Sequence, residues 1–297
     1  LLVSFFALSG CESASDQVEQ GPSPHTLRFS CWSAPTENIF PSIVKSASEE
    51  FEKQTPGLLM DLLFTPDEEY KTKLAIEMAT NEPPDIFMTW SAGFLEPYVK
   101  AQKVINLSTY LKEDPVWARS FQPHVSDDLV FEGGTYAIPL SVTRVGLFYN
   151  TRLFKEAGIH PPTTFGELEQ AIELFRSQNI TPIVVGNEFP WVAGMLYGLL
   201  VNRIGGNKPY DALARGEGSW QDPAFIQAGN YLQRLAAMGA FTPDINQLSY
   251  EKALEHFTQE KAAMYLMGSW VIPRLVEDES LINDHVGVMA FPVMEGG

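Results

Sequence analysis

Residues 136–165 read YAIPLSVTRVGLFYNTRLFKEAGIHPPTTF, and this stretch decides how the rest of the chain is interpreted. The β-branched and aromatic run Val145–Tyr149 predicts a strand, and Asn150–Phe154 after it carries a helix signal. Thr164 and Glu167 then form the capping-box pattern that opens the next helix. A strand that leaves the preceding residues and starts a new α/β unit is what a chain crossing between two lobes requires. We therefore interpret residues 136–165 as an interdomain crossover.

Strands alternate with helices on both sides of this crossover. Most of the expected strands are followed by residues whose apolar positions recur at helical spacing. Such alternation predicts mainly parallel sheets flanked by helices. The expected strands are Thr26–Trp32, Leu58–Phe64, Asp85–Thr89, Val145–Tyr149, Pro182–Gly186, Ala263–Leu266 and Val286–Phe291.

Length and charge restrict the possible classes of protein. A chain of 297 residues can bury two cores of ordinary domain size. Its 45% hydrophobic content is that of a globular protein. The formal net charge of -17 excludes nucleic acid as a partner, because the phosphate backbone would be repelled.

The first eleven residues, LLVSFFALSGC, indicate export. This apolar run is too short to span a bilayer as a helix, and small residues precede Cys11 before a polar spacer over residues 12–25. We interpret it as the apolar region and cleavage site of a secretory signal that begins inside a longer precursor. Leu8–Cys11 resembles a bacterial lipobox, in which the cysteine is lipidated and becomes the mature N-terminus. A buried strand with an incidental cysteine stays open as the alternative.

Only Cys31 remains once Cys11 is assigned to lipid. A single cysteine in an apolar run is expected to be a buried structural thiol, so a disulfide framework is excluded. No Cys/His spacing indicates a zinc site. We expect no metal and no cofactor.

Tryptophans recur in the loops that follow expected strands. In open α/β sheets, ligands bind beyond the carboxyl ends of the strands. A tryptophan face suits the C–H face of a sugar ring, and nearby carboxylates and amides accept hydrogen bonds from its hydroxyls. The alternative, that each tryptophan is half-buried packing, stays open. The loops are Pro35–Glu37, Trp90–Ser91, Asn187–Trp191 and Gly268–Trp270.

Signals for catalysis are weak by comparison. Glu37 and Glu188 could supply the two carboxyls that a glycosidase requires. No nucleophile elbow, phosphate loop or dinucleotide fingerprint is present. Arg144 could bind ligand hydroxyls or a carboxylate, or could join the two lobes. We predict that the chain is not an enzyme and keep the Glu37–Glu188 glycosidase as an alternative.

With these residues in view, the chain resembles bacterial family 1 extracellular solute-binding proteins, the sugar-binding lipoproteins of ABC importers. The similarity extends from Leu27 to Gly297. The segments that carry it are Pro84–Phe87, Tyr136–Pro139, Leu147–Phe154, Ala157–Gly158, Pro161–Phe165, Lys261–Met264, Gly268–Trp270 and Gly287–Pro292.

The resemblance implies an α/β fold, a two-lobed periplasmic-binding-protein-like clam-shell of type II that closes on its ligand by hinge motion. The N-terminal lobe would cover residues 26–140 and the C-terminal lobe residues 141–285. Residues 286–297 would return to the first lobe, and the family's further helices would be missing from this chain. The segment Pro139–Arg144 would be the first hinge.

The resemblance also implies a function. The protein would be an extracytoplasmic receptor, lipid-anchored to the membrane and monomeric, that captures a sugar in an interlobe cleft and delivers it to an ABC permease. A non-sugar solute (glycerol phosphate, a peptide or a polyamine) stays open. The expected ligand-binding residues are Thr36, Glu37, Trp90, Ser91, Arg144, Asn187, Glu188, Trp191, Ser269 and Trp270.

Overall fold

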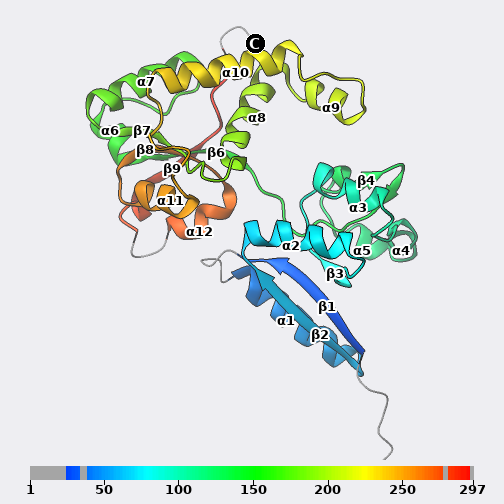
Figure 1. Ribbon diagram of the computed structural model, residues 1–297. Helices are drawn as coiled ribbons and strands as arrows, with labels where there is room; N and C mark the ends of the chain where they lie inside the picture. The colour runs from blue at the N-terminus through cyan, green and yellow to red at the C-terminus, as the bar shows by residue number, and fades with distance from the viewer. Residues whose placement is uncertain (1–24, 34–38, 277–279, 295–297) are drawn as a thin grey trace, which may run out of the picture. The chain divides into compact units, whose positions relative to one another are not determined.

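The computed structural model describes residues 25–33, 39–276 and 280–294 (Figure 1). Contacts divide the chain into two compact units, Leu1–Leu140 and Ser141–Gly297, called unit 1 and unit 2 below. The boundary falls within the segment 139–144 that was expected to bend. The signal segment with its lipidation site Cys11 lies outside the described residues, as do Thr36 and Glu37.

A three-stranded parallel sheet forms the base of unit 1. Its order is β2-β1-β3, so β1 lies in the middle. The pairing of β1 with β2 runs from His25 opposite Leu58 to Trp32 opposite Thr65. The all-parallel arrangement is the one expected from the alternation of strands and helices. The elements are β1 (His25–Trp32), α1 (Ile39–Gln54), β2 (Leu58–Thr65), α2 (Asp67–Ala79) and β3 (Ile86–Phe87).

Short elements complete unit 1 between β3 and the boundary. Gly133, in a left-handed conformation at φ 79°, turns the chain between β4 and β5, which form an antiparallel hairpin. The other elements are brief helical pieces. They are η1 (Ala92–Phe94), α3 (Glu96–Lys100), α4 (Ser108–Glu113), α5 (Pro115–Ala118), η2 (Asp127–Leu129), β4 (Val130–Phe131) and β5 (Gly134–Thr135).

Unit 2 is built on a four-stranded mixed sheet of order β7-β8-β6-β9. The pair β7 and β8 is parallel, but β6 runs antiparallel to both β8 and β9. The expectation of a mainly parallel sheet therefore holds in unit 1 and needs correction in unit 2. Two helices, α6 and α7, separate β6 from β7, so the chain enters β7 in the reverse direction. The strands are β6 (Val145–Asn150), β7 (Thr181–Val184), β8 (Ala262–Gly268) and β9 (Val286–Met289).

Helices cover both faces of this sheet. In Figure 1 the sheet of unit 2 lies between α7 and α10 on one side and α11 and α12 on the other. The helices are α6 (Thr151–Glu156), α7 (Phe165–Ser177), α8 (Trp191–Gly205), α9 (Lys208–Ala214), α10 (Pro223–Ala237), α11 (Tyr250–Thr258), η3 (Ser269–Val271), α12 (Ile272–Leu275) and η4 (Asn283–His285). None of the helices in the described part of the chain is both long and apolar enough to cross a membrane.

Local start signals place two of these helices. The capping box at α7 is confirmed, because Thr164 accepts from the Glu167 backbone N–H and the Glu167 carboxylate accepts from the Thr164 backbone N–H. Asp222 caps α10 by accepting from the backbone N–H of Ala224 at 2.8 Å, with Pro223 at the first helical position.

The two units have cores of different extent. Every residue of β8 is buried, and this strand runs through one continuous apolar cluster that includes α7, α8, α10 and α11. In unit 1 the buried cluster comprises Tyr70, Leu74 and Met78 of α2, against which the half-buried Trp32 and other aromatic residues pack. Unit 2 therefore has the larger and more continuous apolar core of the two units.

The last described segment belongs to unit 2. Strand β9 pairs with β6, from Asn150 opposite Val286 to Leu147 opposite Met289. Val293 then accepts a hydrogen bond from the backbone N–H of Phe165 at 2.9 Å. The return of residues 286–297 to the first lobe stays a prediction.

Candidate functional site

Two tryptophans meet at the carboxyl ends of β7 and β8. These strands are parallel, so their carboxyl ends lie at the same edge of the sheet. Trp191 opens α8 after β7, and Trp270 lies in η3 directly after β8. Their ring centroids are 6.1 Å apart with an interplanar angle of 51°, and both rings are half-buried. The geometry gives unit 2 a fixed aromatic surface at the edge where open α/β sheets bind ligands.

Gly268 allows the Trp270 ring to take this position. A Cβ atom at residue 268 would lie 1.8 Å from Cζ3 of Trp270, far inside van der Waals contact. The backbone of Gly268 is extended, at φ -85° and ψ 161°, so its conformation does not itself require glycine. Glycine is required at this position because the Trp270 ring lies so close to the backbone. The Gly-Ser-Trp sequence after β8 is therefore a local device that lays the indole against the backbone.

The segment 245–249, which precedes α11, is joined to the loop after β7. The backbone N–H of Asn187 donates to the carbonyl of Ile245 at 3.0 Å, and that of Glu188 donates to the carbonyl of Leu248 at 3.0 Å. Gly186 lies so close to this segment that a Cβ there would be 2.6 Å from the Ser249 carbonyl oxygen. The two loops consequently form one structural block.

This block brings a third aromatic ring to the site. Ser249 caps α11 by accepting from the backbone N–H of Lys252, and Tyr250 follows it as the first residue of the helix. The Tyr250 ring centroid lies 6.3 Å from that of Trp191, at an interplanar angle of 33°. Trp191 thus packs near both Tyr250 and Trp270. No local pattern in the sequence indicates Tyr250, because its position depends on hydrogen bonds between segments far apart in the chain.

The Asn187 side chain is engaged within the protein. Its Oδ1 accepts from the backbone N–H of Ala193 at 3.1 Å, in the first turn of α8, and its Nδ2 donates to Oδ1 of Asn246 at 2.7 Å. The first bond satisfies one of the otherwise unpaired N–H groups at the helix start. Asn187 therefore fixes the N-terminal end of α8, where Trp191 lies.

Arg144 and Ser269 are paired through the sheet register. Val145 lies opposite Gly268, so the residues just outside this pair are also neighbours. The Ser269 N–H donates to the Arg144 carbonyl at 2.8 Å, and the Arg144 N–H donates to Ser269 Oγ at 3.2 Å. Both bonds use the backbone of Arg144, whose side chain is exposed. The structure brings these two predicted residues together beside Trp270.

Glu188 is exposed, and its backbone N–H holds it to Leu248. Its expected partner in a glycosidase, Glu37, lies outside the described residues. Among the residues that the structure describes, no group of three His, Cys, Asp or Glu side chains could hold a metal ion.

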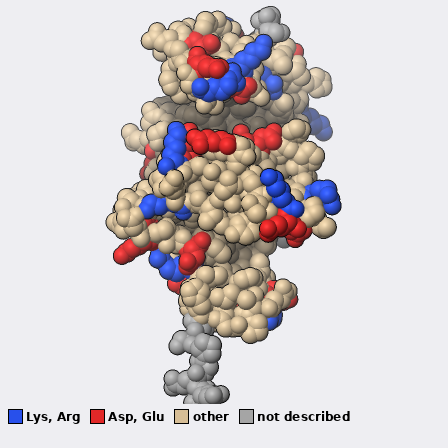
Figure 2. Space-filling view, turned by 90° about the vertical axis from the view of Figure 1, so that its right-hand side faces the viewer, with Lys and Arg blue, Asp and Glu red and all other residues tan. Residues whose placement is uncertain are grey.

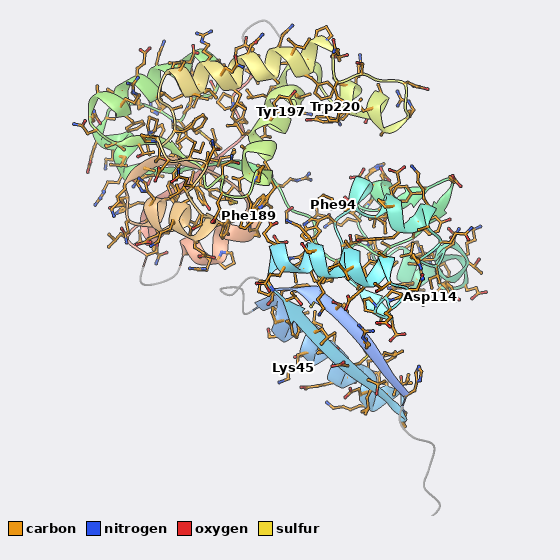
Figure 3. The ribbon with its side chains drawn as sticks, viewed as in Figure 1. Lys45, Phe94, Asp114, Phe189, Tyr197 and Trp220 are labelled. Carbon is orange, nitrogen blue, oxygen red and sulfur yellow. The ribbon has the colours of Figure 1, made fainter. Side chains whose placement is uncertain are left out.

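In unit 1 the predicted Trp90 is held in an aromatic cluster. Its ring stacks on Trp32, with centroids 4.4 Å apart at 13°, and Phe94 packs at 5.5 Å. The ammonium group of Lys71 lies 5.0 Å from the Trp90 ring centroid, in a cation–π contact. Phe94, labelled in Figure 3, is 56% exposed. Trp90 is thus mainly a packing partner of Trp32, and Ser91 precedes η1 beside it.

A buried tyrosine, Tyr70, packs against both tryptophans of this cluster. Tyr70 is fully buried, and its hydroxyl lies 2.6 Å from the carbonyl oxygen of Met88 and 3.1 Å from that of Ser30. Burial raises the pKa of Tyr70 well above its ordinary value. The hydroxyl therefore stays protonated and can donate to the carbonyl of Ser30, in β1, or to that of Met88, just after β3.

The sequence also matches a known protein family. Residues 33–297 match the family described as bacterial extracellular solute-binding protein. The chain belongs to this family. The resemblance read from the motifs is therefore confirmed.

Two solved structures are similar to this solute-binding protein over most of its length. One comes from work on xylan utilization by the thermophilic bacterium Caldanaerobius polysaccharolyticus. It is 33% identical, has a TM-score of 0.83, and covers 92% of this chain and 69% of its own. A chitin oligosaccharide binding protein is 28% identical with a TM-score of 0.82, covering 92% of this chain and 68% of its own. These likenesses confirm the predicted two-lobed, periplasmic-binding-protein-like fold class.

A curated relative extends the comparison. The multiple sugar-binding protein of Streptococcus mutans is 22% identical over 86% of this chain. The aligned part spans 60% of that relative, so this solute-binding protein matches less than two thirds of its length.

Proposed function

We propose that this solute-binding protein is the receptor of a sugar importer, which captures an oligosaccharide and delivers it chemically unchanged to an ABC permease. The observation that carries the proposal is the Trp191–Trp270 pair, held at the carboxyl ends of β7 and β8 with Tyr250 beside it. Half-buried indole faces present flat apolar surfaces to the C–H faces of sugar rings. Polar groups at the same edge, Ser269 and Glu188, can exchange hydrogen bonds with ring hydroxyls.

The relatives support sugar as the ligand class. One solved neighbour is a chitin oligosaccharide binding protein, and a curated relative is a multiple sugar-binding protein. Both of these are named as binding proteins rather than enzymes. Glu188 has an exposed carboxylate, and its proposed partner Glu37 lies outside the described residues, so the geometry gives no specific support to glycoside cleavage.

Further contacts belong to the same proposal. Trp90 and Ser91 of unit 1, together with Thr36, Glu37 and Arg144, are proposed to contact ligand, and single alanine variants test each of them. For Trp90 we expect a smaller effect than for Trp191, because Trp32 already occupies part of its ring surface.

The cellular setting is proposed as well. The family description supports an extracytoplasmic location. Attachment to the membrane through lipid on Cys11 is tested by replacing Cys11 with serine in the full precursor and following labelled palmitate. We expect the label on the wild type and its loss from the variant. Monomeric binding to the permease is tested by light scattering and by co-purification.

The sugar site is tested by calorimetry on Trp191→Ala and Trp270→Ala. A thermal-shift screen with xylo-oligosaccharides, chito-oligosaccharides and raffinose first selects the best ligand, because a ligand bound only by the folded state raises its stability. Each variant is expected to bind that sugar about tenfold more weakly or worse, since buried aromatic anchors dominate recognition. Trp117→Ala, at a 38% exposed tryptophan of unit 1, is the matched control and should bind normally.

Two results would contradict the proposal. Unchanged affinity in both Trp191→Ala and Trp270→Ala would remove the aromatic pair from the site. Chromatography of the sugars after incubation should show the starting oligosaccharides alone. Release of smaller sugars would show that the protein is an enzyme and not a receptor.

A further inference from the structure

One tryptophan of unit 2 lies outside the aromatic site already described. Trp220, in the connection between α9 and α10, is 65% exposed, more than any other described tryptophan. Its neighbours from Arg215 to Gln221 are exposed polar residues and glycines. Burying a tryptophan is strongly favourable, so one held this far out in water needs a physical explanation.

The Trp220 ring is held in place by packing on Phe225. Its centroid lies 4.8 Å from that of Phe225, which is 2% exposed and belongs to the core of unit 2. Tyr197 of α8 stacks on the same Phe225 at 21°, and its hydroxyl donates to the Phe225 carbonyl at 2.9 Å. One face of Trp220 is therefore supported by α8 and α10. Figure 3 shows Tyr197 and Trp220 close together, while Phe189 lies at the opposite, N-terminal end of α8.

The loop that carries Trp220 is ordered by its backbone. The N–H groups of Glu217 and Gly218 both donate to the carbonyl of Ala212 at 2.9 Å. A Cβ at Gly218 would lie 2.6 Å from the backbone nitrogen of Leu213, so the loop packs directly on the end of α9. After Trp220 the chain enters the capped start of α10. A fixed loop presents the indole in one orientation, which lowers the entropy lost on binding.

The surroundings of Trp220 suit a sugar better than a protein. Protein interfaces use about 20 to 30 residues a side around a cluster of apolar anchors. Between residues 206 and 238, the described large apolar side chains with high exposure are Trp220 and Ile226 alone. The same loop carries exposed carboxylate and amide groups that can accept hydrogen bonds from hydroxyls, namely Gln221 and Glu217, whose carboxylate also accepts from Arg215 Nε at 2.8 Å.

We propose that Trp220 is a second stacking platform, which binds an outer unit of an oligosaccharide whose inner units contact Trp191 and Trp270. The inference rests on the proposed sugar-binding function and extends it to ligand length. Helix α8 links the two platforms, since Trp191 begins it and Tyr197 lies six residues later, a rise of about 9 Å. This rise alone is longer than one sugar ring, and Trp220 is joined to Tyr197 only through Phe225. We therefore expect only sugars longer than a disaccharide to contact both platforms.

The test compares ligands of increasing length. Calorimetry is run with the xylose series from xylobiose to xylohexaose and the chitin series from chitobiose to chitohexaose. The proteins are the wild type, Trp220→Ala, Trp220→Phe and Ile226→Ala. We expect Trp220→Ala to bind the long members of the preferred series about fivefold to tenfold more weakly, with unchanged affinity for the disaccharide. Trp220→Phe should restore part of the loss, and Ile226→Ala, the neighbouring apolar control, should match the wild type.

The outcomes separate this inference from the function on which it rests. Equal losses for short and long sugars in Trp220→Ala, or no loss for either, overturn the second platform. If Trp191→Ala and Trp270→Ala weaken binding while Trp220→Ala does not, the sugar site stands and the second platform alone fails. If the wild type binds neither series and no raffinose, both the proposed function and this inference are wrong. Melting curves of the variants confirm that each is folded.

Discussion

A methyl group added at Gly268 would test whether the position of the Trp270 ring matters for binding, with the ring itself retained. In Gly268→Ala the new Cβ would lie 1.8 Å from Cζ3 of Trp270. Ordinary van der Waals contact begins near 3.4 Å, so the ring has to move away by the difference or more. Trp270 is half-buried and follows the strand directly, so its side chain can turn toward solvent while β8 keeps its pairing.

The expected effect is larger on binding than on stability. The extended backbone of Gly268 accepts alanine without strain, and a less flexible residue loses less entropy on folding. The lost contact with Trp191 is worth about 0.5–1.5 kcal/mol, so the free energy of unfolding should change by less than about 1 kcal/mol. Moving an aromatic anchor should weaken sugar binding about tenfold, close to the effect of Trp270→Ala.

The assay combines calorimetry with near-ultraviolet circular dichroism, which reports coupling between neighbouring indoles. Gly229→Ala is the matched control, because a Cβ at this position of α10 meets nothing within 4 Å. This control should bind sugar normally and gain about 0.5–1 kcal/mol of stability from the better helix former. If Gly268→Ala keeps wild-type affinity and an unchanged spectrum, the close approach of ring and backbone is not what positions Trp270.

Two further predictions concern stability. The pKa of Glu167 is lowered chiefly by hydrogen bonds from the backbone and hydroxyl of Thr163, with a further bond from Thr164. Its stabilising effect is therefore full above the ordinary glutamate pKa of about 4.3 and is lost as the pH falls through the lowered value. Urea unfolding of wild type and Glu167→Gln should differ at pH 7 and converge in acid, and a constant difference would rule out the carboxylate bonds. In unit 1, Tyr70→Phe leaves the Met88 carbonyl without its donor and should cost about 1–2 kcal/mol by urea unfolding, whereas Tyr110→Phe, at an exposed ring, should cost nothing measurable.

Local signals in the sequence predicted the parts of the fold that short-range physics controls. The capping box depends on Thr164 and Glu167, which are three positions apart, and it forms as expected. The Asp222 cap of α10 likewise depends on residues only two positions apart. The direction of β6 could not be predicted in this way. It depends on which strands pair with β6 in the sheet, and neither strand propensity nor the helix signals between residues 150 and 167 specify that pairing.

The candidate site shows the same division. Trp191 and Trp270 could be placed together because parallel strands end at one edge of a sheet. Tyr250 could not, because it reaches Trp191 through hydrogen bonds that join residues 187–188 to 245–248. Trp32 carried a usable signal, since it ends the first strand, but its stacking on Trp90 depends on ring orientation, which sequence does not specify.

The unequal cores described above bear on how the chain opens under native conditions. Strand β8, with every side chain buried and paired strands on both sides, belongs to a cooperative unit whose amide protons exchange only when unit 2 unfolds. The buried cluster of unit 1 rests largely on one face of α2, so its amides are expected to exchange through smaller and more frequent openings. A protease present during such openings would cut unit 1 first and leave unit 2 as the resistant fragment. The half of the molecule that holds the Trp191–Trp270 pair is thus also the half that keeps its shape longest.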